Sequence, residues 1–368
     1  MSLARAREIH ASLPVVDGHN DLPWAIRLYH DGLADADTTG PLPTRHTDTA
    51  RLIEGGVGGQ FWSVYVPAWT EEPFSATNEQ IDLVAAMCAR DPRLDLVRTA
   101  REVRESREHG RVGGLLGAEG GHSIENSLDK LRALADRGLR YMTLTHADTI
   151  EWADSATDEH RHGGLTDFGR DVVAEMNRLG VLVDISHVSA DTMRDAIAAS
   201  TVPVIASHSN ARELAPHPRN VPDDVLRRVG ETGGVVMVNF YPAFVNREAA
   251  ERSVEMFADS RALMAELGDP VAVDEALADK RAALPRGTVA EVANHVEHIA
   301  RVAGPHAVGI GSDFDGIDIL IPGLEDVRTY PNLTAELLER GWDEPALRGL
   351  LGDNVLRVLE NAEAVATG

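Results

Sequence analysis

The sequence is poor in several features, and each scarcity excludes a class of protein. The 368 residues include a single cysteine, Cys88, so neither an intramolecular disulfide nor a zinc–thiolate cluster can form. No apolar run approaches the roughly 18–20 residues of a membrane span. The N-terminal stretch MSLARAREIHASLP lacks the apolar centre of a secretion signal. We therefore expect a cytoplasmic protein.

Positive charge is also scarce. Lys and Arg number 35 against 59 Asp and Glu, which gives a formal net charge of −24. Nucleic acids and anionic membranes bind proteins mainly through contacts between basic side chains and phosphate. The charge balance therefore argues against both as partners, and its ordinary role is to keep a protein in solution.

Eight short apolar runs rich in β-branched residues recur along the chain, separated by segments with helical periodicity. They are residues 13–17, 61–66, 112–118, 140–145, 181–186, 202–207, 234–239 and 307–312. This alternation predicts an α/β protein, with a (β/α)8 TIM-like barrel as the best fit and a doubly wound open sheet as the alternative.

Residues 245–290, before the last run, are acidic and helical in pattern, which predicts a helical insertion. The insertion is a candidate lid or subunit contact, and a homodimer is compatible with it. No internal repeat or linker divides the chain. Residues 1–368 are therefore interpreted as one barrel domain.

Metal-ligating and acid–base side chains stand where six of the runs end. They are His19, Asp21, Glu119, His146, His187, His208 and Asp313. A single histidine or aspartate at a strand end is more often a turn or cap residue than a ligand. Chance, however, gives no reason for seven of them to coincide with strand ends. Since the active sites of such barrels lie at the carboxyl ends of the strands, we expect these side chains to meet at one mouth.

The ligand types constrain the metal and the reaction. His19 and Asp21 point to one face if their strand persists through both. Imidazole and carboxylate without thiolate suit zinc, with manganese, iron or cobalt as alternatives. Three histidines and two carboxylates are too many for one catalytic zinc, so we expect two ions ~3.5–4 Å apart, bridged by Glu119. A metal-bridging hydroxide would then attack the substrate, with Asp313 transferring the proton to the leaving group.

Other chemistries find little support. The glycine-rich residues 54–60 neither follow a predicted strand nor match G-x-G-x-x-G, which argues against a dinucleotide site. No nucleophile-elbow pattern is present, which argues against a serine hydrolase.

The same residues lie in segments that resemble the membrane (renal-type) dipeptidase family, the zinc dipeptidases of the amidohydrolase-like barrels. The matching segments include VVDGHNDLPW (15–24), GAEGGHSI (117–124), LRYMTLTH (139–146), ASHSNAR (206–212), HPRNVPDD (217–224) and GIGSDFDG (309–316). The resemblance implies hydrolysis of dipeptides to free amino acids, with tolerance of a D-residue at the C-terminal position. It also implies that His19 and Asp21 bind one zinc, that His187 and His208 bind the other, and that Glu119 bridges them.

Further roles follow from the resemblance. Asp313 matches the catalytic acid/base, with Asp315 as a near alternative, and His146 matches the residue that helps polarise the scissile carbonyl. Arg219 corresponds to the residue that binds the free α-carboxylate, for which a planar guanidinium is well suited. Two residues are weaker candidates for substrate contact, namely Asn220 and Tyr241.

Two alternatives stay open at this stage. One is an amidohydrolase or deacetylase that acts on N-acyl amino acids on the same barrel, because a fold does not determine a substrate. The other is a non-catalytic metal-binding module. Asp313 and His146 argue against a purely structural metal site, which needs neither.

Overall fold

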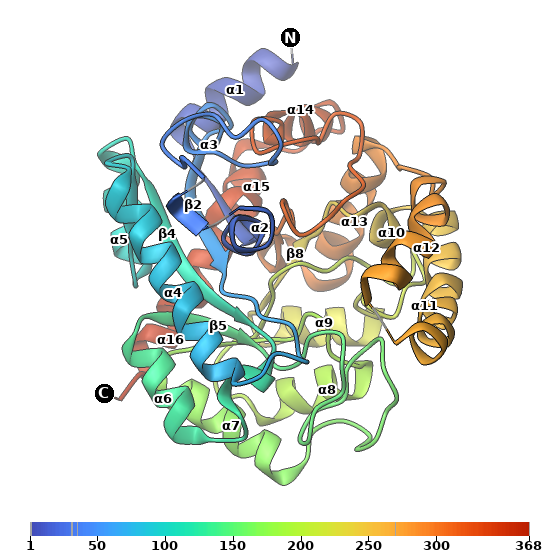
Figure 1. Ribbon diagram of the computed structural model, residues 1–368. Helices are drawn as coiled ribbons and strands as arrows, with labels where there is room; N and C mark the ends of the chain where they lie inside the picture. Colours follow the sequence, from blue (N-terminus) through green and yellow to red (C-terminus); the bar gives the residue numbers. More distant parts are fainter. Residues whose placement is uncertain (1, 31, 35, 269, 368) are drawn as a thin grey trace.

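A closed ring of eight parallel strands forms the centre of the molecule (Figure 1), in a computed structural model that describes residues 2–30, 32–34, 36–268 and 270–367. The strands of the sheet, of which all but β3 belong to the ring, are β1 (Val15–Asn20), β2 (Val57–Ser63), β3 (Leu94–Leu96), β4 (Val112–Glu119), β5 (Leu139–Thr143), β6 (Leu182–Asp184), β7 (Ile205–Ala206), β8 (Val235–Val238) and β9 (Val308–Ile310). Their order is β2-β1-β9-β8-β7-β6-β5-β4-β3, and an additional pairing of β2 with β4 closes the ring and leaves β3 outside it. The predicted (β/α)8 barrel is confirmed.

Helices surround the ring (Figure 1). They are α1 (Ser2–Ser12), α2 (Leu22–Tyr29), α3 (Thr49–Glu54), α4 (Pro73–Arg90), α5 (Ala100–Glu108), α6 (Leu128–Asp136), α7 (Asp167–Leu179), α8 (Ala190–Ala199), α9 (Asp223–Glu231), α10 (Pro242–Val245), α11 (Arg247–Leu267), α12 (Pro270–Ala282), α13 (Val289–Ala303), α14 (Tyr330–Glu339), α15 (Glu344–Arg348) and α16 (Asn354–Val365). Among the described residues, no helix combines the length and the apolar character that crossing a bilayer requires.

The interior of the barrel is filled at the end opposite the predicted site. Phe61 of β2 and Ile205 of β7 belong to one buried apolar cluster with Leu359 of α16. Gly352, just before α16, lies against the start of β1, where an added Cβ would stand 3.1 Å from the carbonyl oxygen of Pro14. The helix therefore closes the amino-terminal end of the barrel, and the carboxyl ends of the strands form the mouth.

The eight predicted strands are all present, but their bounds differ from the apolar runs. The run 202–207 contains only the two-residue β7, and Pro203, which has no N–H to donate to a ladder, falls before the strand. The sequence does not predict β3, because Leu94–Leu96 is short and pairs only with β4 outside the ring.

The glycine-rich segment before the second run is part of a strand. β2 starts at Val57, so Gly58 and Gly59 are strand residues, whereas the sequence pattern starts this strand at residue 61. An added Cβ would stand 2.4 Å from Cβ of Pro14 at Gly58 and 2.9 Å from Cγ1 of Val103 at Gly59. Glycine is therefore needed here for close packing rather than for a turn.

The predicted helical insertion is present before the last strand. Helices α11 and α12 occupy most of residues 245–290 and lie at one side of the molecule, beside α10 and α13 (Figure 1). Arg281 of α12 forms an ion pair of 3.3 Å with Asp318, in the loop after β9. The insertion thus contacts the mouth of the barrel.

Candidate active site

The seven predicted side chains all lie at the carboxyl end of the barrel. His19 is in β1 and Glu119 is the last residue of β4, whereas the others follow their strands by one to three residues, namely Asp21, His146, His187, His208 and Asp313. One expectation is wrong in detail. Strand β1 ends at Asn20, and Asp21 is the residue that caps α2, so the pair does not share a strand face. The turn nevertheless brings the two side chains together.

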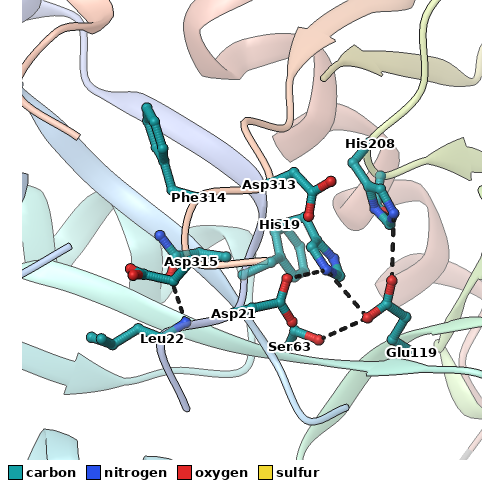
Figure 2. Close-up of polar contacts among 12 residues, drawn as sticks. His19, Asp21, Leu22, Ser63, Glu119, His208, Asp313, Phe314 and Asp315 are labelled. Carbon is teal, nitrogen blue, oxygen red and sulfur yellow. Dashed lines mark hydrogen bonds and ion pairs between the residues drawn. The ribbon is translucent and has the colours of Figure 1, made fainter. Parts of the chain in front are cut away.

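The first group is centred on His19, which Figure 2 shows between two carboxylates. Its Nε2 lies 3.1 Å from Oδ2 of Asp21 and 3.5 Å from Oε2 of Glu119. Its Nδ1 pairs with the hydroxyl of Tyr141 at 2.7 Å. Tyr141 therefore fixes the imidazole ring through Nδ1, and Nε2 faces the two carboxylates.

The second group is centred on the other oxygen of Glu119. Oε1 lies 2.9 Å from Nε2 of His187 and 3.5 Å from Nε2 of His208, and these two nitrogens are 2.8 Å apart. Glu119 therefore stands between a His–Asp pair and a His–His pair, with one carboxylate oxygen directed to each. This is the arrangement expected of a bridging carboxylate.

Three residues that the sequence analysis did not identify orient the histidines. Tyr141 holds His19, while the hydroxyl of Ser207 lies 2.8 Å from Nδ1 of His208 and donates to Oδ2 of Asp184 at 2.6 Å. Such carboxylate–hydroxyl–histidine chains fix which ring nitrogen carries the proton. The only sequence signal is a polar residue inside an apolar run, as in VLVDIS and VPVIAS.

Buried atoms without hydrogen-bond partners show that the residues fit a cation. Among the described residues, Nε2 of His19 and Oδ1 of Asp21 are buried and make no hydrogen bond. Ligand atoms within 4.8 Å of one another form three overlapping groups: His19, Glu119 and His208; Glu119, His146 and His187; His19, Asp21 and Asp313. Nitrogen and carboxylate oxygen without sulfur match the preferences of zinc.

The charges agree with this fit. Burial opposes the charge of Glu119, but the neighbouring His19 and His146 and a hydrogen bond with His187 hold the pKa of its carboxyl well below the ordinary value. Burial lowers the pKa of His187 and His208 well below that of a free imidazole, aided by the positive charge of Arg219. The second group, centred on Oε1 of Glu119, therefore has the protonation state that binds metal, an ionised carboxylate beside neutral imidazoles. Burial opposes the charge of His19, but Tyr141, Asp21 and Glu119 hold its pKa well above that of a free imidazole, so a metal that binds there must displace its proton.

Two site residues have strained backbones. His187 has φ of 67° and Asp313 has φ of 68°, in the left-handed region that non-glycine residues seldom occupy. Such conformations cost on the order of 1–3 kcal/mol and persist where the surrounding structure enforces them. At strand ends they turn the side chains into the mouth, which agrees with a functional role.

The structure favours Asp313 over its neighbour Asp315 as the acid/base. Asp313 groups with His19 and Asp21, and its Oδ2 accepts a hydrogen bond of 2.8 Å from the amide of Asn239. Burial raises the pKa of Asp313 to about 7, which His19 opposes and the charge of Asp21 supports. Figure 2 shows Asp315 directed away from this cluster.

His146 and Arg219 lie on the cavity wall. Nε2 of His146 is 3.9 Å from Oε1 of Glu119, and its ring packs against that of His187 with centroids 4.4 Å apart. Arg219 is 3% exposed, and among the described residues no carboxylate lies within ion-pair distance of it. Burial lowers the pKa of Arg219 to about 10, although Asp313 opposes this. A buried guanidinium without an acid partner is suited to a substrate carboxylate.

The two weaker candidates for substrate contact differ in position. Tyr241 lines the cavity and packs edge-on against Phe244. Asn220 is fully buried, and its amide nitrogen donates to the carbonyl oxygens of Ala215 and Phe244 at 2.9 Å each. It is not among the residues that line the cavity. In this structure Asn220 therefore holds its loop, and its contact with substrate stays a prediction.

A cavity of about 680 Å³ covers the site. Glu119, His146, His187, Arg219 and Asp313 are among its lining residues. Its size is within the range of small-molecule sites. Cys88, in contrast, is buried in α4 away from the cavity lining, and burial raises the pKa of its thiol to about 12.

Comparison with known proteins agrees with this geometry. Residues 3–368 match the family model "Membrane dipeptidase (Peptidase family M19)". Dipeptidase verJ of Clonostachys rogersoniana is 37% identical over 99% of this chain and 88% of its own length. Dipeptidase 3 of Mus musculus is 38% identical over 98% of this chain and 67% of its own.

A solved structure is similar over the same extent. The metallopeptidase of Rhodobacter sphaeroides, liganded with a phosphinate mimic of the dipeptide L-Ala-D-Ala, has a TM-score of 0.78 and 27% identity, covering 95% of this chain and 99% of that one. The family match over nearly the whole chain and the two relatives above 30% identity carry the assignment. The chain belongs to the membrane dipeptidase family M19 and is a metal-dependent dipeptidase.

Proposed function

We propose that this dipeptidase uses two zinc ions and accepts dipeptides with either an L- or a D-residue at the C-terminal position. One observation carries the proposal of two ions. The carboxylate of Glu119 directs one oxygen to His19 and the other to His187 and His208. His19 and Asp21 would hold one ion, His187 and His208 the other, and Glu119 both.

The chain's own residues supply binding and proton transfer. Arg219 binds the free α-carboxylate of the substrate through its planar N–H edge. Zinc held by these residues would supply Lewis-acid chemistry, which would lower the pKa of a bound water and polarise the scissile carbonyl. His146 donates a hydrogen bond to that carbonyl oxygen. Asp313 accepts the proton from the attacking water and passes it to the departing amine as the C–N bond breaks.

The tolerance of a D-residue has its support in a relative. The Rhodobacter sphaeroides metallopeptidase binds a phosphinate mimic of L-Ala-D-Ala and shares the fold over nearly its whole length. A grip on the α-carboxylate alone does not distinguish the two configurations at the C-terminal residue, because Arg219 contacts the carboxylate and not the side chain.

A substrate panel with metal analysis tests the proposal. Purified protein should contain two zinc ions per chain, and it should hydrolyse L,L- and L,D-dipeptides but not N-acetyl amino acids. Turnover of the acetylated compounds alone would favour the deacetylase alternative. One ion per chain at full activity would contradict the proposed bridging role of Glu119. The single-domain organisation, the cytoplasmic location and a homodimer stay predictions.

A further inference from the structure

A second guanidinium on the cavity wall has no acid partner. Arg45 precedes α3 and lines the cavity together with Trp24 and Tyr29 of α2. It is half-buried, and its Nε lies below the surface without a hydrogen-bond partner in the described structure. Among the described residues, no carboxylate lies within ion-pair distance of its guanidinium. A partly buried cation in this state is costly unless a ligand completes it.

Two other arginines that precede or follow the strands nearby are paired with acids. Arg51, six residues away, contacts the carboxylates of Asp48 and Asp326 at 2.7 and 3.3 Å and donates to two carbonyl oxygens. Arg93 contacts Asp91 at 2.7 Å. With 59 acidic residues for 35 basic ones, unpaired acids are abundant. The absence of one beside Arg45 leaves its donors available to the cavity.

An aromatic ring lies beside the side chain. The guanidinium carbon of Arg45 lies 4.4 Å from the ring centroid of Tyr29. A guanidinium beside an aromatic ring keeps N–H donors for an acceptor, and a carboxylate fits its planar edge with two parallel hydrogen bonds. Arg45 therefore has the chemistry that receives a carboxylate.

The position of Arg45 indicates which part of a dipeptide it would contact. Arg219 follows β7, whereas Arg45 lies between β1 and β2, and in the ring β9 and β8 separate β1 from β7. Figure 1 shows α3 and α9, which follow these two residues, on opposite sides of the strands. Arg45, Glu119 and Arg219 all line the cavity, so a dipeptide with its α-carboxylate on Arg219 and its carbonyl beside Glu119 would direct its N-terminal residue toward Arg45.

We propose that Arg45 is a specificity-determining residue that binds a side-chain carboxylate, so that the preferred substrates are dipeptides with Asp or Glu as the N-terminal residue. This inference rests on the proposed dipeptide hydrolysis. Two other acids line that side of the cavity. Asp318 pairs with Arg281 at 3.3 Å, and Oδ1 of Asp315 accepts the backbone N–H of His46 at 2.8 Å, whereas its Oδ2 is buried without a hydrogen-bond partner. Neither lies within ion-pair distance of Arg45, which keeps its N–H groups for an acidic side chain of the substrate.

Two pairs of substrates test the inference. Glutamyl-alanine and glutaminyl-alanine differ only in the side-chain charge of the N-terminal residue, and alanyl-glutamate and alanyl-glutamine differ likewise in the C-terminal residue. The wild-type protein should have a kcat/KM about 10- to 100-fold higher for glutamyl-alanine than for glutaminyl-alanine. Arg45→Gln should abolish that ratio through the KM of glutamyl-alanine and leave glutaminyl-alanine unchanged.

A matched control and the opposing outcomes complete the experiment. Arg27→Gln removes an arginine of α2 that pairs with Glu79 at 2.9 Å on the surface, and it should leave the hydrolysis of all four substrates unaffected. An equal loss on both glutamyl and glutaminyl substrates, or a loss confined to alanyl-glutamate, would overturn the assignment of Arg45. Hydrolysis of all dipeptides without a glutamyl preference would overturn it and leave the proposed function standing. Failure on every dipeptide would instead overturn the proposed function itself.

Discussion

A substitution of Asp184 would perturb the second group of candidate ligands, which is centred on Oε1 of Glu119, without replacing a ligand itself. Its carboxylate is fully buried and accepts four hydrogen bonds. Oδ1 accepts the backbone N–H groups of Ser186 and Ser207 at 3.0 and 2.8 Å, and Oδ2 accepts the hydroxyls of Thr143 and Ser207 at 2.6 Å each. Because the Ser207 hydroxyl donates to Asp184, it accepts Nδ1–H of His208 and leaves Nε2 with a lone pair.

The choice of substitution follows from these bonds. Asp184→Ala would leave four buried donors unpaired at about 1–3 kcal/mol each, which is comparable with the whole stability of a domain. Asp184→Asn keeps the shape. Its oxygen must face the two fixed backbone N–H groups, so its amide nitrogen faces the hydroxyls of Thr143 and Ser207. Ser207 then turns to donate to Nδ1 of His208, and the proton of this histidine moves to Nε2, the atom that faces Glu119.

We expect Asp184→Asn to weaken zinc binding at the second site about 10- to 100-fold, the usual effect of losing a partner behind a metal ligand. Titration against a competing chelator measures the affinity, and long-range ¹H–¹⁵N spectra of the metal-free protein report the tautomer of His208. Ser207→Ala and the double variant provide the control, since Asp184→Asn should add little once the hydroxyl is gone. Unchanged affinity together with an unchanged tautomer would refute the reasoning.

Three further predictions concern the proton, the carboxylate and acid stability. Asp313→Asn should leave the zinc content unchanged by metal analysis and lower kcat about 10²- to 10⁴-fold; full turnover would exclude proton transfer by Asp313. Arg219→Met should raise KM for free dipeptides far more than for C-terminally amidated ones, and equal effects would remove its role. Burial lowers the pKa of His10 to about 4, with Gly55 O and Thr334 Oγ1 at its two ring nitrogens. The unfolded chain, with an imidazole pKa of about 6.5, binds the proton better, so stability is complete above that pH and falls by about 3 kcal/mol as the pH drops toward 4. Urea unfolding at pH 7.5 and 5 should show a smaller difference for His10→Asn than for the wild type, and an equal difference would contradict the argument.

The fold could be predicted because every barrel strand is buried on both faces and reads as an apolar run. The exceptions have local causes. Gly58 and Gly59 resemble a turn in sequence but are strand residues, since Pro14 and Val103 leave no room for a side chain. Leu94–Leu96 lies outside the ring and pairs only with β4. It therefore lacks the continuous apolar run that marks a barrel strand.

The sequence predicts those site residues whose reactive side chains stand at the end of a strand. It predicts less well the residues that reach the site from other positions. His19, Glu119 and His208 follow from that rule, whereas Tyr141 and Ser207 act from within apolar runs and become visible only through their bonds to the histidines. Substrate contact by Asn220 stays a prediction. The residue stands in a matching motif beside Arg219, and in this structure the carbonyl oxygens of Ala215 and Phe244 occupy its amide nitrogen.

The ring closure also has a consequence for biosynthesis. Strand β1, which carries His19, pairs with β2 on one side and with β9, the last strand to be translated, on the other. A nascent chain therefore exposes one unpaired edge of β1 until almost the entire polypeptide has left the ribosome. Chains that terminate early would retain that open edge, which makes them prone to aggregation and suited to capture by chaperones.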